Sequence, residues 1–185
     1  GTGPAFNRAV TVVAGSGLRT IGAQETGLYN RGSFGPITLS KDVILFGHTT
    51  YASTFGGVIS GSGGIICDSD PSKPGISLSA NNSYSGTTLI KSGTVAWNQD
   101  VFVNTNSPVG NGSSPVQIGG GDGSANAALL CRGYFKAFNR DIIVAAGTGT
   151  RAFGQGGDGS NPQFTMNGNI FLNRDLAIPV YDNYG

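Results

Sequence analysis

The chain has 185 residues, a formal net charge of +1 and only 11% charged residues. Its hydrophobic fraction of 38% is too high for a disordered chain, and its weak charge offers no electrostatic footprint for nucleic acid. Glycine is abundant, with 32 residues, whereas Glu25 is the only glutamate and Met166 the only methionine. Because residues with strong helix propensity are scarce, this composition indicates an all-β chain.

The longest apolar runs, such as residues 43–46, are far too short to cross a membrane, so the sequence predicts no membrane span. The chain opens on Gly1, with no initiator methionine and no signal peptide. We therefore expect it to be a processed form or an excerpt of a longer protein.

Short strand segments follow one another along the chain, separated by Gly, Asn, Ser or Pro. Many of them alternate apolar and polar residues, as a strand with one buried face does. In chain order, strands are expected at residues 10–13, 37–39, 43–46, 75–78, 87–90, 94–97, 116–118, 142–144 and 170–172. Asn-Gly or Asp-Gly hairpin turns between clean strands are mostly missing, which favours parallel winding over a meander of hairpins.

A long internal repeat organises the chain. Residues 5–22 match residues 137–154 at an offset of 132, with ten of 18 positions identical. The match resumes one residue later in register, so that residues 1–50 resemble residues 133–185. A period of about 132 residues divides into about six coils of roughly 22 residues, as in a β-helix whose coils contact only their neighbours. The sequence thus predicts one parallel β-helix segment over residues 1–185, with about 7–8 coils.

Residues 55–65 read FGGVISGSGGI, and residues 76–95 read ISLSANNSYSGTTLIKSGTV. These segments resemble the autotransporter-associated β-strand repeat, whose Asn-x-Tyr-Ser-Gly-Thr-Thr core is matched by residues 82–88. Residues 108–121 look like the usual continuation of that repeat, and residues 167–176 resemble the segment that opens the next one. The resemblance covers most of the chain.

Two departures from the family pattern are visible. The Ser-Gly-Gly-Thr-Thr segment is shortened to residues 85–88, and residues 67–74 replace a shorter turn. Each suggests a loop variation on one coil. The resemblance implies a right-handed parallel β-helix that serves as scaffold, without enzymatic activity. It also implies an extracellular or outer-membrane-associated location, in an autotransporter passenger or a giant bacterial surface protein.

An enzymatic alternative must be weighed, because parallel β-helices also carry polysaccharide-degrading sites, which need converging carboxylates. The ten acidic residues are scattered, and only Asp68 and Asp70 lie close together, in a turn bounded by proline. A solvated turn is favoured for this pair over a weak cation site or catalysis. His48 is the only histidine, so we expect it in a turn or at the surface.

Two glycine-rich segments, residues 119–124 and 156–160, are similar to calcium-binding nonapeptide repeats but lack their tandem register, which favours loops without metal. Cys67 and Cys131 form no metal motif, and we expect two small buried residues. They are about three coils apart, too far for a disulfide bond.

Four aromatic residues, Tyr84, Trp97, Phe102 and Tyr134, are candidates for a sugar-stacking platform, although packing in the core or at corners is favoured. The sequence therefore predicts no catalytic, cofactor or metal site. The leading hypothesis is a structural segment of a fibre, sheath, adhesin or passenger, whose ends stack on neighbouring repeats or on other copies to form a filament. The alternative is a carbohydrate-binding or polysaccharide-degrading β-helix with surface polysaccharide as its partner.

Overall fold

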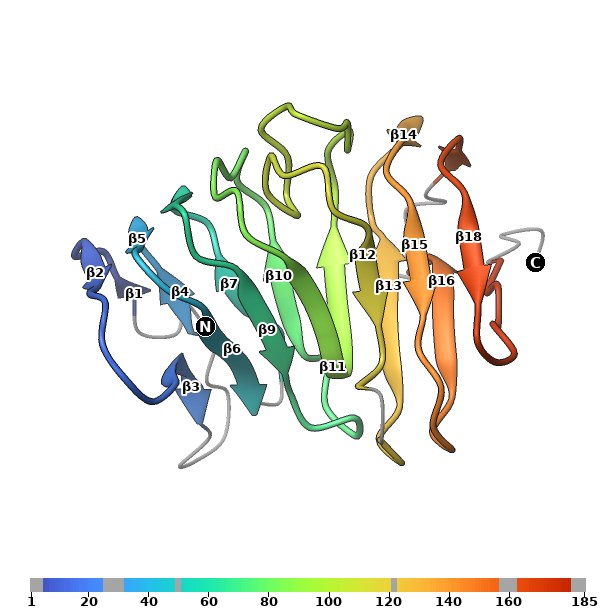
Figure 1. The fold of residues 1–185 in the computed structure, drawn as a ribbon, viewed down its shortest axis with the longest axis horizontal. Helices are drawn as coiled ribbons and strands as arrows, with labels where there is room; N and C mark the ends of the chain where they lie inside the picture. The colour runs from blue at the N-terminus through green and yellow to red at the C-terminus, as the bar shows by residue number, and fades with distance from the viewer. Residues whose placement is uncertain (1–4, 25–31, 49–50, 121–122, 157–162, 181–185) are drawn as a thin grey trace.

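The computed structural model describes residues 5–24, 32–48, 51–120, 123–156 and 163–180. This part of the chain contains 18 short strands and no helix, and hence no helix that could cross a membrane. Figure 1 shows the strands side by side along the long axis of the molecule, from β2 at the left to β18 at the right. Every pairing between named strands is parallel. The predicted all-β solenoid is confirmed.

The chain winds along three faces, which we call A, B and C in the order in which it meets them. Face A contains β1 (Ala5–Phe6), β4 (Ser33–Phe34), β7 (Ser53–Phe55), β10 (Ile76–Leu78), the second half of β11 (Thr88–Trp97), β13 (Ala127–Cys131) and β16 (Arg151–Gln155). Face C contains β3 (Arg19–Gln24), β6 (Val43–His48), β9 (Ile65–Asp68), the first half of β11, β12 (Val116–Ile118), β15 (Ile142–Val144) and β18 (Ile170–Leu172).

Face B consists of two ladders separated by a long connection. Its strands are β2 (Val10–Val12), β5 (Ile37–Leu39), β8 (Ile59–Gly61), β14 (Lys136–Phe138) and β17 (Phe164–Met166). The connection over residues 98–115 lies between the ladders. A parallel bridge between Val101 and Phe138 joins it to the second ladder. A hydrogen bond from the N–H of Asn111 to the carbonyl of Tyr84, 2.9 Å long, joins it to the preceding turn.

The solenoid makes about six turns, which separate seven strands stacked on face A and seven on face C. The turns differ in length. Paired residues in successive strands of face C are separated by 22 residues at Val43 and Ile65 but by 28 at Ile142 and Ile170. On face A, Val95 and Leu129 are separated by 34. Loops between the strands contain these extra residues, so the number of residues per turn varies along the solenoid.

The two copies of the repeat form the same strands on different faces. At an offset of 132 residues, β1, β2 and β3 correspond to β14, β15 and β16. The first three lie on faces A, B and C, whereas their counterparts lie on faces B, C and A. After β1 the chain returns to face A five times before it reaches β14, so one repeat spans five and one third turns. This corrects the expectation of about six coils per repeat.

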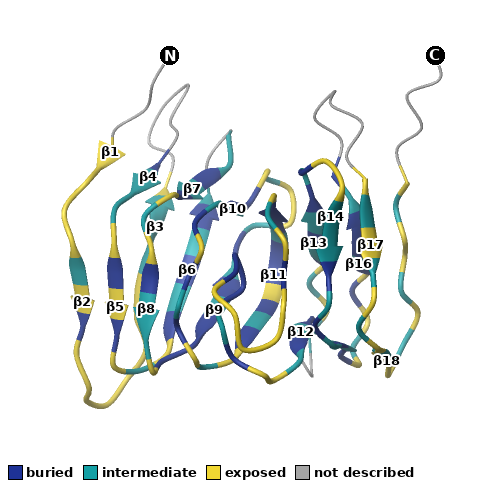
Figure 2. Cartoon of the chain, turned by 90° about the horizontal axis from the view of Figure 1, so that it is seen from above, coloured by how far each residue is buried: buried dark blue, intermediate teal, exposed yellow. Residues whose placement is uncertain are grey.

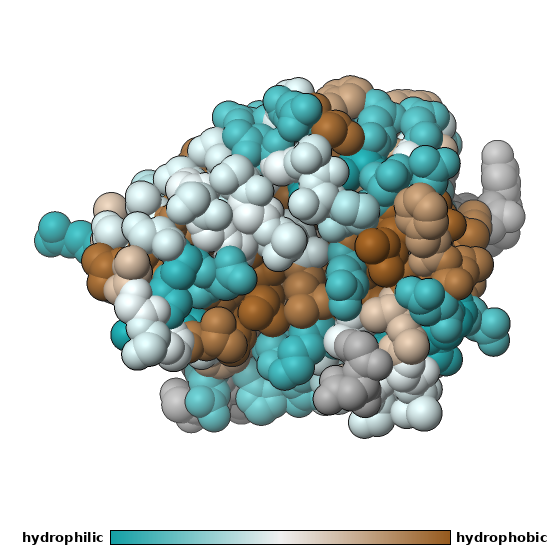
Figure 3. Space-filling model, in the orientation of Figure 1, coloured by the Kyte–Doolittle hydropathy of each residue, from teal (hydrophilic) through white to brown (hydrophobic). Residues whose placement is uncertain are grey.

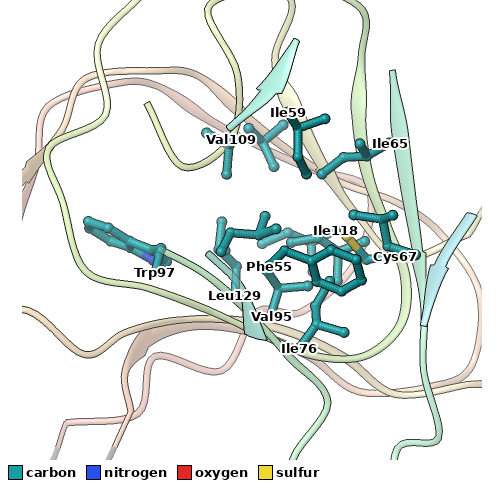
Figure 4. Close-up of a cluster of buried hydrophobic side chains, with 14 of the residues drawn as sticks. Phe55, Ile59, Ile65, Cys67, Ile76, Val95, Trp97, Val109, Ile118 and Leu129 are labelled. Atoms are coloured by element: carbon teal, nitrogen blue, oxygen red, sulfur yellow. The ribbon is translucent and has the colours of Figure 1, made fainter. Parts of the chain in front are cut away.

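The core lies between the three faces. Strands alternate buried and less buried residues, as β6 does over its whole length, so that one row of side chains points inward. Figure 4 shows these side chains meeting from three sides, and Figure 2 shows the buried segments in dark blue. The inward rows are rich in β-branched and aromatic residues, which suit a pleated surface that is buried on one side. The labelled core residues are Phe55, Ile59, Ile65, Cys67, Ile76, Val95, Trp97, Val109, Ile118 and Leu129.

Candidate functional site

An open groove on face B carries polar and aromatic side chains together. It arises because the turn that contains residues 98–115 is the longest one on face A, and residues 102–106 of this turn are exposed. The groove has a volume of about 300 Å³. Its lining residues are Asn81, Gln99, Asp100, Phe102, Thr105, Asn106 and Lys136.

The base of this groove is held by backbone pairing. Val101 is fully buried, and its N–H donates to the carbonyl of Ala137 at 2.8 Å, while its own carbonyl accepts from the N–H of Asn139 at 2.8 Å. Asp100 Oδ1 accepts from the N–H of Ala137 at 2.9 Å. The side chain of Gln99 donates to the carbonyl of Ser79. These contacts give the loop a defined shape and leave Phe102 partly exposed beside it.

A second groove of about 230 Å³ shares Lys136 with the first one. Phe135 lines it and is 79% exposed. The backbone of Phe135 has a φ of +48°, a left-handed conformation that costs a residue with a side chain about 1–2 kcal/mol. Tyr134, next to it, is also exposed. Aromatic rings flanking amide, carboxylate and ammonium groups form a surface that can stack on a sugar ring and hydrogen-bond its hydroxyls.

Of the four aromatic residues considered for such a surface, two lie in the core. The ring of Trp97 packs edge-on against Phe138 at 5.3 Å between centroids, and the hydroxyl of Tyr84 hydrogen-bonds Thr88 at 2.7 Å. Phe102 and Tyr134 are exposed and lie outside the core. Phe135 and Lys136 were not predicted as site residues, although the run Tyr134–Phe135–Lys136 is visible in the sequence as two aromatic residues followed by a charged one.

Asp68 and Asp70 do not converge on a site. Asp68 accepts from Lys91 Nζ at 2.7 Å and from the Ser92 hydroxyl at 2.6 Å. Asp70 contacts His48 Nε2 at 2.8 Å. The partners lie 22 to 24 residues away along the chain, so these contacts join neighbouring turns. Asp68 is the last residue of β9 and Asp70 follows the strand, and each carboxylate has its own partner.

The pKa values of the two carboxyl groups reflect these contacts. Hydrogen bonds from the N–H and hydroxyl of Ser72, and then from His48, lower the pKa of Asp70 to about 2. Partial burial would raise the pKa of Asp68, but the hydrogen bonds from Lys91 and Ser92 outweigh it, and that pKa is lowered. Over the part of the chain that the structure describes, no three His, Cys, Asp or Glu side chains are grouped as metal ligands.

The first glycine-rich segment is only partly within the described residues, since Gly121 and Asp122 lie outside them, as do residues 157–160 of the second segment. In the described part, the side chain of Arg151 lies against the first segment. Its guanidinium donates to the carbonyls of Ala125 at 2.7 Å and of Gly123 at 3.2 Å. An always-protonated side chain therefore uses these oxygens.

Cys67 and Cys131 are free and buried, as predicted. They lie on different faces of the solenoid, in β9 and β13. Burial raises the pKa of both thiols, so neither is poised for chemistry.

No family model, curated protein or solved structure matches this chain.

Proposed function

We propose that the chain is a structural segment, a rigid β-helical spacer of a secreted or bacterial cell-surface protein such as a fibre, sheath, adhesin or autotransporter passenger. The observation that supports this best is the reuse of one pattern of strand pairing. Val10 pairs with Ile37 in the first copy of the repeat, and their counterparts Ile142 and Ile170 pair in the second. Likewise, Thr20 pairs with Ile44, and their counterparts Ala152 and Ala177 form a bridge.

Such a unit can be extended without any change of its internal contacts, because each turn touches only its neighbours. Hydrogen bonds run between turns from end to end, so a longer array behaves as a stiff rod. The surface location rests on the resemblance of residues 55–65 and 76–95 to the autotransporter-associated repeat.

Both ends of the solenoid carry apolar side chains at the surface. Figure 3 shows apolar surface at the end that carries β18, and Figure 2 shows exposed segments in yellow at both ends. The exposed apolar residues at the ends are Phe6, Val13, Leu18, Phe171, Leu172, Ile178 and Val180. Open strand edges with apolar side chains favour stacking on neighbouring repeats or on other copies, which would extend a filament.

The spacer function is tested by solution scattering on arrays of one, two and three repeats. Each added repeat should lengthen the particle by about 26 Å at constant cross-section, since five and one third turns rise about 4.8 Å each. Arrays that bend freely between repeats, or that widen instead of lengthening, would exclude a rigid spacer. Whole-cell labelling of the source bacterium with antibodies against the chain tests the surface location, which labelling only after lysis would contradict.

The groove on face B supports a second candidate function, the binding of a surface polysaccharide. Phe102 and Phe135 are exposed aromatic rings beside amide and charged side chains. Asp100 is the one carboxylate that lines the groove in the described chain, so binding without cleavage is the better fit.

Affinity electrophoresis in gels that contain bacterial or plant polysaccharides tests this candidate. Binding should retard the chain, and Phe102→Ala or Phe135→Ala should restore its mobility. Phe171→Ala, a similarly exposed ring on face C, serves as the control. Equal retardation of all three variants would count against the groove.

A further inference from the structure

Two arginines of the repeat have opposite environments in its two copies. Arg8 corresponds to Arg140 and Arg19 to Arg151 at the offset of 132. Arg8 and Arg19 are exposed. Arg140 and Arg151 are among the largest fully buried side chains of the molecule. The surrounding sequences are similar, with ten of 18 positions identical, and we attribute the difference in burial to the neighbouring turn.

In the second copy, the preceding turn supplies acceptors for both side chains. Arg140 donates from Nε to the carbonyl of Ser114 at 2.6 Å and from Nη1 to that of Val109 at 2.7 Å. Arg151 donates to the carbonyls of Ala125 and Gly123. All four acceptors lie 26 to 31 residues earlier in the chain.

The same turn covers the strands on either side of these arginines. Val101 bridges to Phe138, β12 pairs with β15, and β13 pairs with β16. Together, residues 98–131 form one turn that covers the β14–β16 edge on all three faces.

In the first copy, β1, β2 and β3 have no strand on this side within the residues that the structure describes. Phe6 is 50% exposed, whereas its counterpart Phe138 is fully buried. Among the described residues, Arg19 donates to carbonyls of its own loop, the nearest being that of Ser16 at 3.3 Å. The β1–β3 edge therefore carries the apolar residues and the donors of the β14–β16 edge, but without the turn that covers them.

We propose that the β1–β3 edge is a docking surface for another copy of the 132-residue repeat, placed immediately before it in the same polypeptide. The turn equivalent to residues 98–131 covers the edge. Arg8 and Arg19 select it by donating to the carbonyls equivalent to Val109, Ser114, Gly123 and Ala125. This deepens the spacer function proposed above and rests on it.

The two arginines favour one particular turn on this edge, because burying a guanidinium without hydrogen-bond acceptors costs much free energy. A turn that lacks carbonyls at these positions would leave both charges buried and unpaired. The edge at the other end of the solenoid is a different turn of the repeat. It consists of β17, β18 and residues 176–178, which correspond to β4–β6, and in the first copy those strands are followed by β7–β9. If the β18 end stacked directly on the β1–β3 edge of a second chain, that edge would be covered by a different turn of the repeat from the one that covers β14–β16.

A tandem chain tests the proposal. Residues 1–132 are fused directly to the full 185-residue chain, so that Arg132 precedes the second Gly1 as it precedes Gly133 in the single chain. Limited trypsin digestion, followed by mass spectrometry, reports cleavage after Arg8 and Arg19. In the single chain both sites should be cut readily. In the second unit of the tandem, cleavage should slow by about tenfold or more, to the level seen at Arg140 and Arg151.

Substitutions supply the matched control. Arg8→Gln with Arg19→Gln in the second unit should lower the urea midpoint of the tandem. The same pair in the first unit, where the edge stays open, should leave the midpoint unchanged. A tandem of the expected length whose second-unit arginines are still cut, and tolerate substitution, would overturn the docking role while the spacer function stands.

Two other outcomes would also overturn the proposal. Two units that unfold independently and show no increase in length would overturn the spacer function as well. Concentration-dependent association of the single chain that protects Arg8 and Arg19 would identify a second copy, and not a preceding repeat, as the occupant.

Discussion

The side-chain oxygen of Asn82 accepts a hydrogen bond from the backbone N–H of Ile59, one turn earlier, at 2.8 Å. The side-chain amide of Asn82 donates to the carbonyl of Pro108, one turn later, at 2.7 Å. Asn82 is fully buried, so a single side chain holds three consecutive turns together where face B has no regular strand.

Replacing Asn82 with alanine should lower the free energy of unfolding by about 3 kcal/mol, because it leaves a buried N–H and a buried carbonyl without partners. Urea unfolding followed by circular dichroism measures the change. Asn81→Ala is the control, since Asn81 is exposed, and its effect should stay within about 0.5 kcal/mol. Similar effects at both positions would contradict the role assigned to Asn82.

Gly75 lies against the next turn with a φ of +77°, and a Cβ atom there would collide with the backbone carbonyl of Thr94. Gly75→Ala should therefore destabilise the chain by about 3 kcal/mol, from backbone strain and from separation of β10 and β11. At Gly56 the nearest atoms to an added Cβ are 3.8 Å away, so Gly56→Ala should change stability by no more than about 0.5 kcal/mol. Thermal melting of the two variants side by side decides the point.

The two thiols should be silent in the native protein. Cys67 and Cys131 are buried and free, and the raised pKa values keep them protonated at neutral pH. Ellman's reagent should titrate no thiol in buffer and two thiols in concentrated urea. A disulfide-bonded species on a non-reducing gel, or fast labelling of the folded chain, would show that this assignment is wrong.

Asp70 should contribute stability that depends on pH. Its pKa of about 2 in the folded chain lies below the ordinary value of 3.8, so its contribution is fully present above pH 3.8 and is lost as the pH falls towards 2. Asp70→Asn should therefore unfold at lower urea concentration than the parent at pH 7, and the two should converge near pH 2. A difference that persists unchanged at pH 2 would point to a packing effect instead. Carbon-13 NMR of the carboxyl group gives the titration midpoint directly.

The residues of the groove on face B could not be predicted from the sequence alone. Trp97 and Phe102 are aromatic residues five positions apart in the sequence, yet Trp97 packs against Phe138 whereas Phe102 lines a groove. Lys136 and Asp100 line the same groove because Val101 pairs with the strand that begins at Lys136, and no local pattern announces this pairing.

The sequence by itself determined the strand class, the parallel winding and the repeat. These properties follow from features that can be recognised in the sequence alone, namely the glycine content, the apolar alternation and the match of residues 5–22 to residues 137–154. Only the tertiary structure decided the number of turns, because loops of unequal length can be inserted between strands without altering the strand pattern. It alone also decided which face each copy occupies. Arg19 and Arg151 differ in exposure because a side chain's environment in a solenoid depends on the turn stacked against it, and that turn is distant in the sequence.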